Sequence, residues 1–255
     1  VVDVRTKGDV AVRGARNTIT GLNISAVNAA DTTAVAQGIT VDVAGAGAMV
    51  AKATDAVTGT VNLASSTLKA AGETAKTLTV ERRNSTRAES FMGYGGGLTG
   101  VGAVSRVTDS GRVNLALDTV TFGDADERAP WMVTALNHPD LSTESGAAGG
   151  SVVGVGVVRS AITATGGTDA TLTRTGLLTR SLNVTAATGE ESTEESRALR
   201  MRAEVESAGG EVLGLHFNDS VMRNDTTTNV TVDLAGAADR ARAGDFTLTS
   251  GSFAR

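Results

Sequence analysis

The chain contains no cysteine, two prolines, two histidines and few aromatic residues, and each shortage excludes a class of structure or site. Without cysteine there is no disulfide framework, thiolate zinc site or thiol nucleophile. Two histidines leave little for a transition-metal centre. Because aromatic residues make up only 3% of the 255, Val, Leu, Ile and Ala must fill the core. Two prolines remove few donors from a β-ladder, so the sequence is compatible with long strands.

Positive charge is also scarce, since 23 Lys and Arg stand against 28 Asp and Glu, giving a net charge of −5 and a pI near 5.1. No window gathers the Lys and Arg needed to displace counterions from phosphates, so nucleic acid is not expected as a partner. No run of about 18 apolar residues is present, so no membrane-spanning helix is expected. The chain begins Val1-Val2-Asp3 without Met or a signal peptide, which indicates a piece of a longer polypeptide.

Three segments recur in the same order along the chain, and this repeat is the strongest signal in the sequence. One is an alternating segment, one is rich in glycine, and the third is again alternating. Equivalent positions are about 50 to 60 residues apart. We therefore expect a single repeat-built segment over 1–255, with repeats near 22–77, 78–130, 131–181 and 182–245. The first segment begins at Leu22, Leu78, Trp131 and Leu182, the glycine-rich one at Gly45, Gly95, Gly149 and Gly209, and the last at Val61, Val113, Ala170 and Val230, after an earlier copy at Val10.

The copies read as β-strands, because apolar Val113, Leu115 and Leu117 alternate with more polar neighbours. Stacking such copies predicts an all-β fold, a β-solenoid, with a right-handed parallel β-helix built from internal repeats of about 53 residues as the leading form. Each repeat could hold two turns of about 26 residues or three of about 18, and the residues do not decide between them. An array of small β-sandwiches, one for each repeat, is the alternative, although about 53 aromatic-poor residues make a marginal core.

Two local features follow from the alignment of the copies. Asn28, Asn84 and Asn137 fall at the same position and predict an interrupted amide ladder at a turn, unless a repeat holds two turns. The glycine-rich segments predict a narrow region, where Gly and Ala let opposite sheets approach while Val and Leu fill the gap. Compositional drift is the competing interpretation of these glycines.

The fourth copy is longer than the others by about ten residues, and the charged segment over 189–202 is the expected insertion. Acidic residues come early in this segment and Arg comes late, which suits either a short surface helix or a protruding loop. Its acidic residues are candidate surface-loop residues, since loops often carry function. They are Glu190, Glu191, Glu194 and Glu195.

One loop supports an enzyme hypothesis, because carboxylates beside a basic residue could act as acid, base or divalent-ion ligands in a polysaccharide-active β-helix enzyme. A solvated turn is the favoured interpretation, since Tyr94 and Trp131 are the only Tyr and Trp that could hold a sugar. Trp131 moreover takes the place of a core leucine. We expect no catalytic, cofactor-binding or metal site and no cofactor. The loop residues in question are Asp124, Asp126, Glu127 and Arg128.

Three further patterns favour structural roles. The stretch 95–100 matches the dinucleotide fingerprint G-x-G-x-x-G, but strand-like residues follow it where that motif needs a helix. His138 lies in Asn-His-Pro-Asp, a turn by composition, and His216 lies in an alternating strand. We expect both histidines to be structural.

The segments 22–28 and 131–137 and the glycine and valine run 149–158 resemble the passenger repeats of large bacterial autotransporter and filamentous adhesins, and look closest to the leukotoxin-like filamentous adhesin family. The resemblance covers most of the chain as repeat texture and assigns no functional residue. It implies a secreted or surface-displayed, non-enzymatic fibre, extracellular or at the bacterial cell surface. Its expected partners are a host or neighbouring cell surface, protein or glycan, or copies of itself, held by multivalent contacts. A self-assembling extracellular filament subunit and, as the weaker choice, a polysaccharide-active enzyme are the alternatives.

Overall fold

The computed structural model describes residues 2–6, 9–15, 18–20, 24–69, 74–123, 129–189, 199–234 and 245–252. Within these ranges the chain is all-β and contains no helix. Accordingly, none of the described segments is a helix with the length and hydrophobicity needed to cross a membrane.

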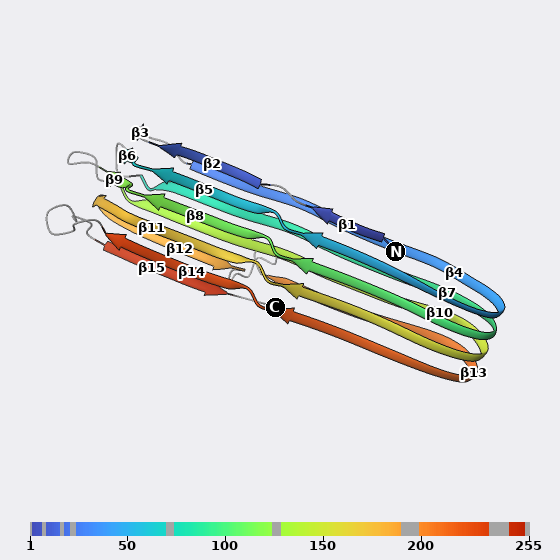
Figure 1. Cartoon of the computed structure of the whole chain (residues 1–255). Helices are drawn as coiled ribbons and strands as arrows, with labels where there is room; N and C mark the ends of the chain where they lie inside the picture. The colour runs from blue at the N-terminus through green and yellow to red at the C-terminus, as the bar shows by residue number, and fades with distance from the viewer. Residues whose placement is uncertain are drawn as a thin grey trace.

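The strands form four rows, each made of one long strand and the shorter strands that follow it (Figure 1). Row 1 consists of β4 (Ile24–Asp55), β5 (Thr58–Ala64) and β6 (Thr67–Lys69). Row 2 consists of β7 (Lys76–Asp109), β8 (Arg112–Asp118) and β9 (Thr121–Gly123), and row 3 of β10 (Trp131–Ala164) and β11 (Gly167–Leu178). In row 4 the long strand is divided into β12 (Ser181–Thr188) and β13 (Arg200–Asn224), and β14 (Thr227–Leu234) follows. Before row 1 lie β1 (Val2–Thr6), β2 (Asp9–Ala15) and β3 (Thr18–Thr20), and after row 4 lies β15 (Asp245–Ser252).

All pairing is parallel, and neighbouring strands in a sheet come from consecutive rows. One sheet has the order β1-β4-β7-β10-β12-β15, with β13 also paired to β10. The other has the order β2-β5-β8-β11-β9-β6-β3, with β14 also paired to β11. Ile24 faces Leu78, 54 residues later, so one repeat contributes one row. The predictions of two or three turns per repeat and of a separate sandwich per repeat are therefore wrong, because each strand bonds to its counterpart in the next repeat.

The observed register differs by two residues from the one expected from the sequence. Leu78 pairs with Ile24 and with Val133, where the sequence alignment placed it opposite Leu22 and Trp131. A shift of two residues keeps every side chain on the same face of the sheet, so the alternation of apolar and polar residues does not reveal it. Trp131 does pair with Leu182, as the alignment predicted.

The shift changes the predicted asparagine ladder. Asn28 and Asn137 each face Arg82, so an arginine separates the two amides. Asn84 lies two positions further on, opposite Ala30 and Pro139. The ladder of three asparagines is thus wrong, and the middle position is occupied by a buried charge.

Each long strand doubles back on itself at one end of the molecule, with reversals at residues 42–45, 96–99, 151–154 and 211–214 (Figure 1). We call this end of the molecule the tip; it includes the reversals and the residues of both legs that flank them. Close approach across the reversal explains its glycines: a Cβ on Gly45 would lie 2.9 Å from Asp42 Cβ, and one on Gly154 2.7 Å from Ser151 Oγ. The second half of the glycine prediction is only partly right: Val101 and Val158 are buried between the legs, but Val155 and Val157, which follow the reversal of row 3, are exposed.

The interior holds three apolar clusters separated by polar layers. The largest lies in the broad part, where the short strands β5, β8, β11 and β14 face the long ones, and it contains Trp131, 1% exposed, edge-on to Phe122. This confirms the expected core position of Trp131. The other two clusters lie between the two legs of the long strands, nearer the tip. Buried serines separate these two, with Ser105 Oγ 3.0 Å from Ser90 Oγ and Ser160 Oγ 3.1 Å from Ser145 Oγ.

A corner with left-handed backbone recurs after β5, β8 and at the matching point of β11. Ser65, Thr119 and Arg174 have φ of 49°, 58° and 50°. The amide of Ser65 donates to the Asp118 carbonyl at 2.8 Å, and that of Thr119 to the Thr173 carbonyl at 2.8 Å. Three rows thus adopt one corner with three different side chains, none of them glycine.

Two local predictions are corrected by the long strands. His138 and Pro139 lie inside β10, so the predicted turn at 137–140 is wrong. Within the predicted insertion 189–202, Arg200 to Arg202 belong to β13 and pair with 140–142 of β10. The extra length of row 4 therefore lies between Thr188 and Arg200.

Candidate functional site

A buried ionic cluster lies between the largest apolar cluster and the next. The Arg82 guanidinium, with its side chain fully buried, is 2.8 Å from Asp55 of row 1, in contact with Asp109 of row 2, and donates to Asn137 Oδ1 of row 3 at 2.8 Å. Gly111 provides the space, since a Cβ there would lie 2.3 Å from Arg82 Cζ. The cluster joins three rows and has no solvent access, so its role is structural.

The charges of this cluster do not balance, because one guanidinium faces two carboxylates. Burial raises the pKa of the Asp109 carboxyl above its ordinary value, and the nearby Asp55 carboxylate raises it further, while Arg82 acts in the opposite direction. The amides of Val57 and Gly111 donate to Asp55 Oδ1 and Asp109 Oδ1 at 2.9 and 3.1 Å. These turn contacts fix both carboxylates at the ends of their strands.

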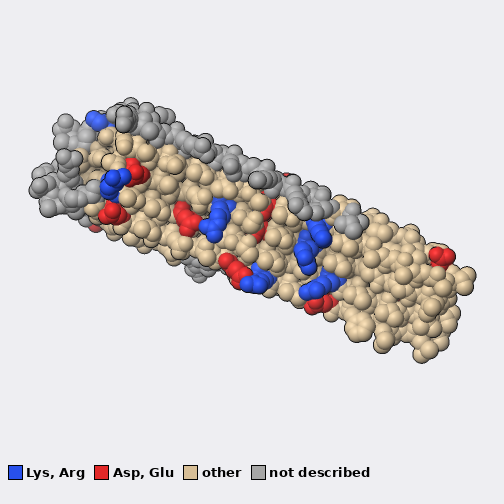
Figure 2. Space-filling view, in the orientation of Figure 1, with Lys and Arg blue, Asp and Glu red and all other residues tan. Residues whose placement is uncertain are grey.

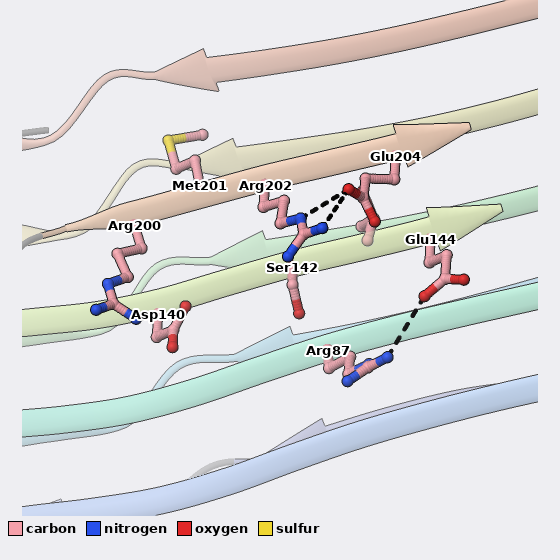
Figure 3. Close-up of a pocket in the computed structure, with 9 residues that line it drawn as sticks. Arg87, Asp140, Ser142, Glu144, Arg200, Met201, Arg202 and Glu204 are labelled. Atoms are coloured by element: carbon pink, nitrogen blue, oxygen red, sulfur yellow. Dashed lines mark hydrogen bonds and ion pairs between the residues drawn. The ribbon is translucent and has the colours of Figure 1, made fainter. Parts of the chain in front are cut away.

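The candidate site is a groove of about 540 Å³ on the outer face of β7, β10 and β13 (Figure 3). We call it the charged groove. Arg87, Ser142 and Arg202 lie side by side on the three strands, because each is paired with the next. Figure 3 shows the polar ends of these side chains directed to the outside of the sheet. The full lining is Arg87, Asp140, Ser142, Thr143, Glu144, Arg200, Met201, Arg202 and Glu204.

Opposite charges alternate in the charged groove. Arg87 lies 3.4 Å from Glu144 and also contacts Glu89, and Arg202 Nε donates to Glu204 at 2.8 Å. These side chains are largely exposed: Arg202 has 74% of its side chain in solvent and Arg87 49%. The groove can therefore offer paired donors and acceptors to a polar partner.

A second titratable cluster lies at the tip of row 4. Tyr94 donates its hydroxyl to Glu211, and His216 Nε2 is 3.0 Å from the same Glu211 oxygen. Burial and the Glu211 carboxylate raise the pKa of Tyr94 to about 12, and the Tyr94 hydrogen bond lowers the pKa of Glu211. The Tyr94 ring passes over Gly149 and Gly209, where a Cβ would collide with its backbone or hydroxyl. The cluster thus fastens row 2 to row 4 across the tip.

The predicted surface residues cannot be placed in this site. The acidic loop candidates Asp124, Asp126 and Glu127, with Arg128, lie outside the described residues, and so do Glu190, Glu191, Glu194 and Glu195. Among the described residues, no group of three or more His, Asp or Glu is arranged to hold a metal ion.

The groove residues were missed at the level of sequence, although one signal was available. Arg87-x-Glu89 and Arg202-x-Glu204 repeat the same pattern at equivalent positions of rows 2 and 4. Only the correct register places Ser142 and Glu144 between them. In an alignment shifted by two residues, Ser142 no longer lies opposite Arg87 and Arg202.

Neither a family model, a curated protein nor a solved structure matches this chain. The fold and the geometry of the charged groove therefore carry the functional argument.

Proposed function

We propose that this chain is a β-solenoid section, a right-handed parallel β-helix, of a secreted or surface-displayed bacterial fibre, and that it acts as a non-enzymatic adhesive scaffold. The observation that carries the proposal is the parallel pairing of each repeat with the next at a spacing of 51 to 60 residues. Rows that bury their apolar faces against neighbouring rows form an extendable rod. The resemblance to leukotoxin-like filamentous adhesins, based on repeat texture, supports the same function.

The charged groove is the contact surface in this proposal. Its exposed ion pairs hold arginines and carboxylates at the spacing of adjacent strands, about 4.8 Å. Single contacts of this kind are weak because solvent screens them. When many rods are displayed together, weak contacts add through effective concentration. The partner class is a polar protein or glycan at a host or neighbouring cell surface.

Bead adhesion tests the proposal. Microspheres coated with the full chain at graded densities are added to cultured epithelial cells, and we expect binding to rise steeply with density. A triple variant of the groove should reduce binding at least about tenfold, while a control with three other exposed, ion-paired arginines exchanged should bind normally. The variants are Arg87→Ser/Arg200→Ser/Arg202→Ser and the control Arg112→Ser/Arg174→Ser/Arg223→Ser.

Two outcomes would overturn this function. Beads that fail to bind at every density would remove the adhesive role, and equal loss in both triple variants would remove the groove as its location. Release of reducing ends from a panel of acidic polysaccharides, abolished by Asp124→Asn or Asp126→Asn, would establish the enzyme in its place.

A further inference from the structure

The outer surface beside the tip is apolar over three neighbouring strands. We call it the apolar face; it lies on the returning legs of β7, β10 and β13. Its residues form columns across rows, because Leu98, Val153 and Leu213 are paired in sequence, as are Val155 with Leu215 and Val157 with Phe217. The exposed fractions run from 36% to 67%. The apolar face consists of Leu98, Val153, Val155, Val157, Leu213, Leu215 and Phe217.

On β10 this exposure does not come from a missing neighbouring strand, whereas β13, which carries Leu213, Leu215 and Phe217, is paired on one edge only among the described strands. β10 is paired along this stretch on both edges, with β7 and with β13. Val155 nevertheless remains 44% exposed and Val157 45%. At the alternate position Gly156 the interior is already occupied, since a Cβ there would lie 2.7 Å from His216 Nδ1. In row 3, therefore, Gly154 and Gly156 face inward and Val155 and Val157 face outward.

Charge is absent from the apolar face. Residues 90–105 and 145–158 contain no Asp, Glu, Lys or Arg. In the matching stretch of row 4 the one acidic residue over 207–218, Glu211, has a side chain only 8% exposed. Figure 2 shows the end of the molecule with the tip largely free of charged side chains, whereas blue and red side chains gather over the remainder. A contiguous uncharged surface of this size marks an interaction site.

We propose that the apolar face binds the apolar face of a second copy of this chain, side by side, in a two-fold arrangement. If a fully exposed Val, Leu or Phe presents roughly 150–200 Å², the seven residues expose on the order of 600 Å² per copy. Two copies would then bury about 1,200 Å², at the lower limit of specific interfaces. Sheet faces pack about 10 Å apart with interdigitating side chains.

The border of the apolar face favours a second copy as its partner. Arg159 and Asp219 lie there, 3.0 Å apart and each about half exposed. A two-fold interface uses the same surface of both copies. A border that carries one positive and one negative side chain can therefore pair each charge with the opposite charge of the second copy. A lipid surface is a poorer fit, because the face carries none of the basic residues that bind anionic headgroups. This inference depends only on the outer surface and is independent of the adhesive function.

Sedimentation velocity of the full chain over about 5 to 200 µM tests the proposal. We expect the wild type to dimerise and Val155→Glu to remain monomeric at every concentration, with unchanged circular dichroism. Met132→Glu is the matched control, since Met132 lies on the same strand and is also 44% exposed. It should dimerise like the wild type. A monomeric wild type, or a Val155→Glu variant that still dimerises, would overturn the proposal.

A second measurement locates the interface and distinguishes other occupants. Because the chain has no cysteine, Val155→Cys and Met132→Cys each accept one spin label. A dimer through the apolar face gives a shorter distance between labels at 155 than at 132, and the reverse order contradicts it. Flotation with phosphatidylcholine vesicles addresses lipid: vesicle binding by a wild type that stays monomeric, lost in Val155→Glu, would replace the second copy with a membrane.

Discussion

The broad part of the molecule and the tip solve the same packing problem in opposite ways. In the broad part, apolar residues such as Leu115 and Trp131 lie inside and charged residues lie outside. At the tip, Gly154 and Gly156 point inward and Val155 points outward. The difference follows from the space between the legs: in row 3 the residues that face inward nearest the reversal are glycines, while Val158, further from it, is buried. The distance from the reversal therefore decides, in this row, which residues can be buried between the legs.

The interior of the broad part is also wide enough to hold charge. The side chains of Arg82 and Asp109 are fully buried there. At the tip, by contrast, the Glu211 side chain keeps 8% of its surface exposed to solvent. A buried cation with two anions must keep all its partners, because an uncompensated charge in a low-dielectric interior is strongly destabilising. The packing of the tip depends instead on glycines, because a Cβ at several of these positions would collide with neighbouring atoms.

The largest effect is expected from removing the buried cation. Arg82→Met leaves Asp55 and Asp109 buried without their counter-ion, and should lower the free energy of unfolding by about 3–5 kcal/mol. Urea denaturation followed by circular dichroism measures the loss. Arg87→Met, on the same strand but half exposed, should change it by less than about 1 kcal/mol. Equal effects would show that the buried cluster is not what distinguishes the broad part.

An intermediate effect is expected from filling the tip. In Gly149→Ala the new Cβ would lie 1.9 Å from the Tyr94 carbonyl oxygen, so backbone must move, and we expect a loss of about 1–3 kcal/mol in unfolding free energy. Gly210→Ala has no atom within 4 Å of the new Cβ and should be neutral or slightly stabilising. Thermal unfolding of both variants provides the comparison. If the two alanines cost the same, steric space does not control the composition of the tip.

The smallest effect is expected at the tip, in the cluster of Tyr94, Glu211 and His216. It tests how dry the interior of the tip is in comparison with that of the broad part. The tyrosinate absorbance of Tyr94, the only tyrosine, should appear with a midpoint of about 12. Its folded pKa is raised, so the stability it contributes is present below 10.0 and is lost as the pH rises toward 12. Glu211→Gln removes the carboxylate and should lower the midpoint, but burial should keep it above 10.0. An ordinary midpoint in the wild type would mean that the tip is open to water.

The alternation of apolar and polar residues predicted strands correctly, and the internal repeat predicted their parallel stacking. The alternation could not set the register, because a period of two residues is satisfied equally by alignments that differ by two. The two-residue error at Leu78 moved Arg82 out of its column and concealed the ionic cluster. A buried arginine is also rare enough that composition gives no reason to expect one.

The candidate site was missed for the same reason. Arg87, Ser142 and Arg202 are 55 and 60 residues apart, and only the pairing of β7, β10 and β13 makes them neighbours. The left-handed corners show a related limit. They are occupied by Ser65, Thr119 and Arg174, so no glycine or asparagine marks them in the sequence.

The unequal spacing in row 4 has a consequence for how such a chain can diverge. β10 faces β12 at a separation of 51 residues and β13 at 60, so nine residues are added between Thr188 and Arg200 while the strands on both sides keep their partners. A change of length at this point of the chain leaves the described pairing on both sides intact. Foreign peptides grafted there would be carried at a fixed height on an unaltered scaffold, and natural variants can acquire new recognition segments at the same point.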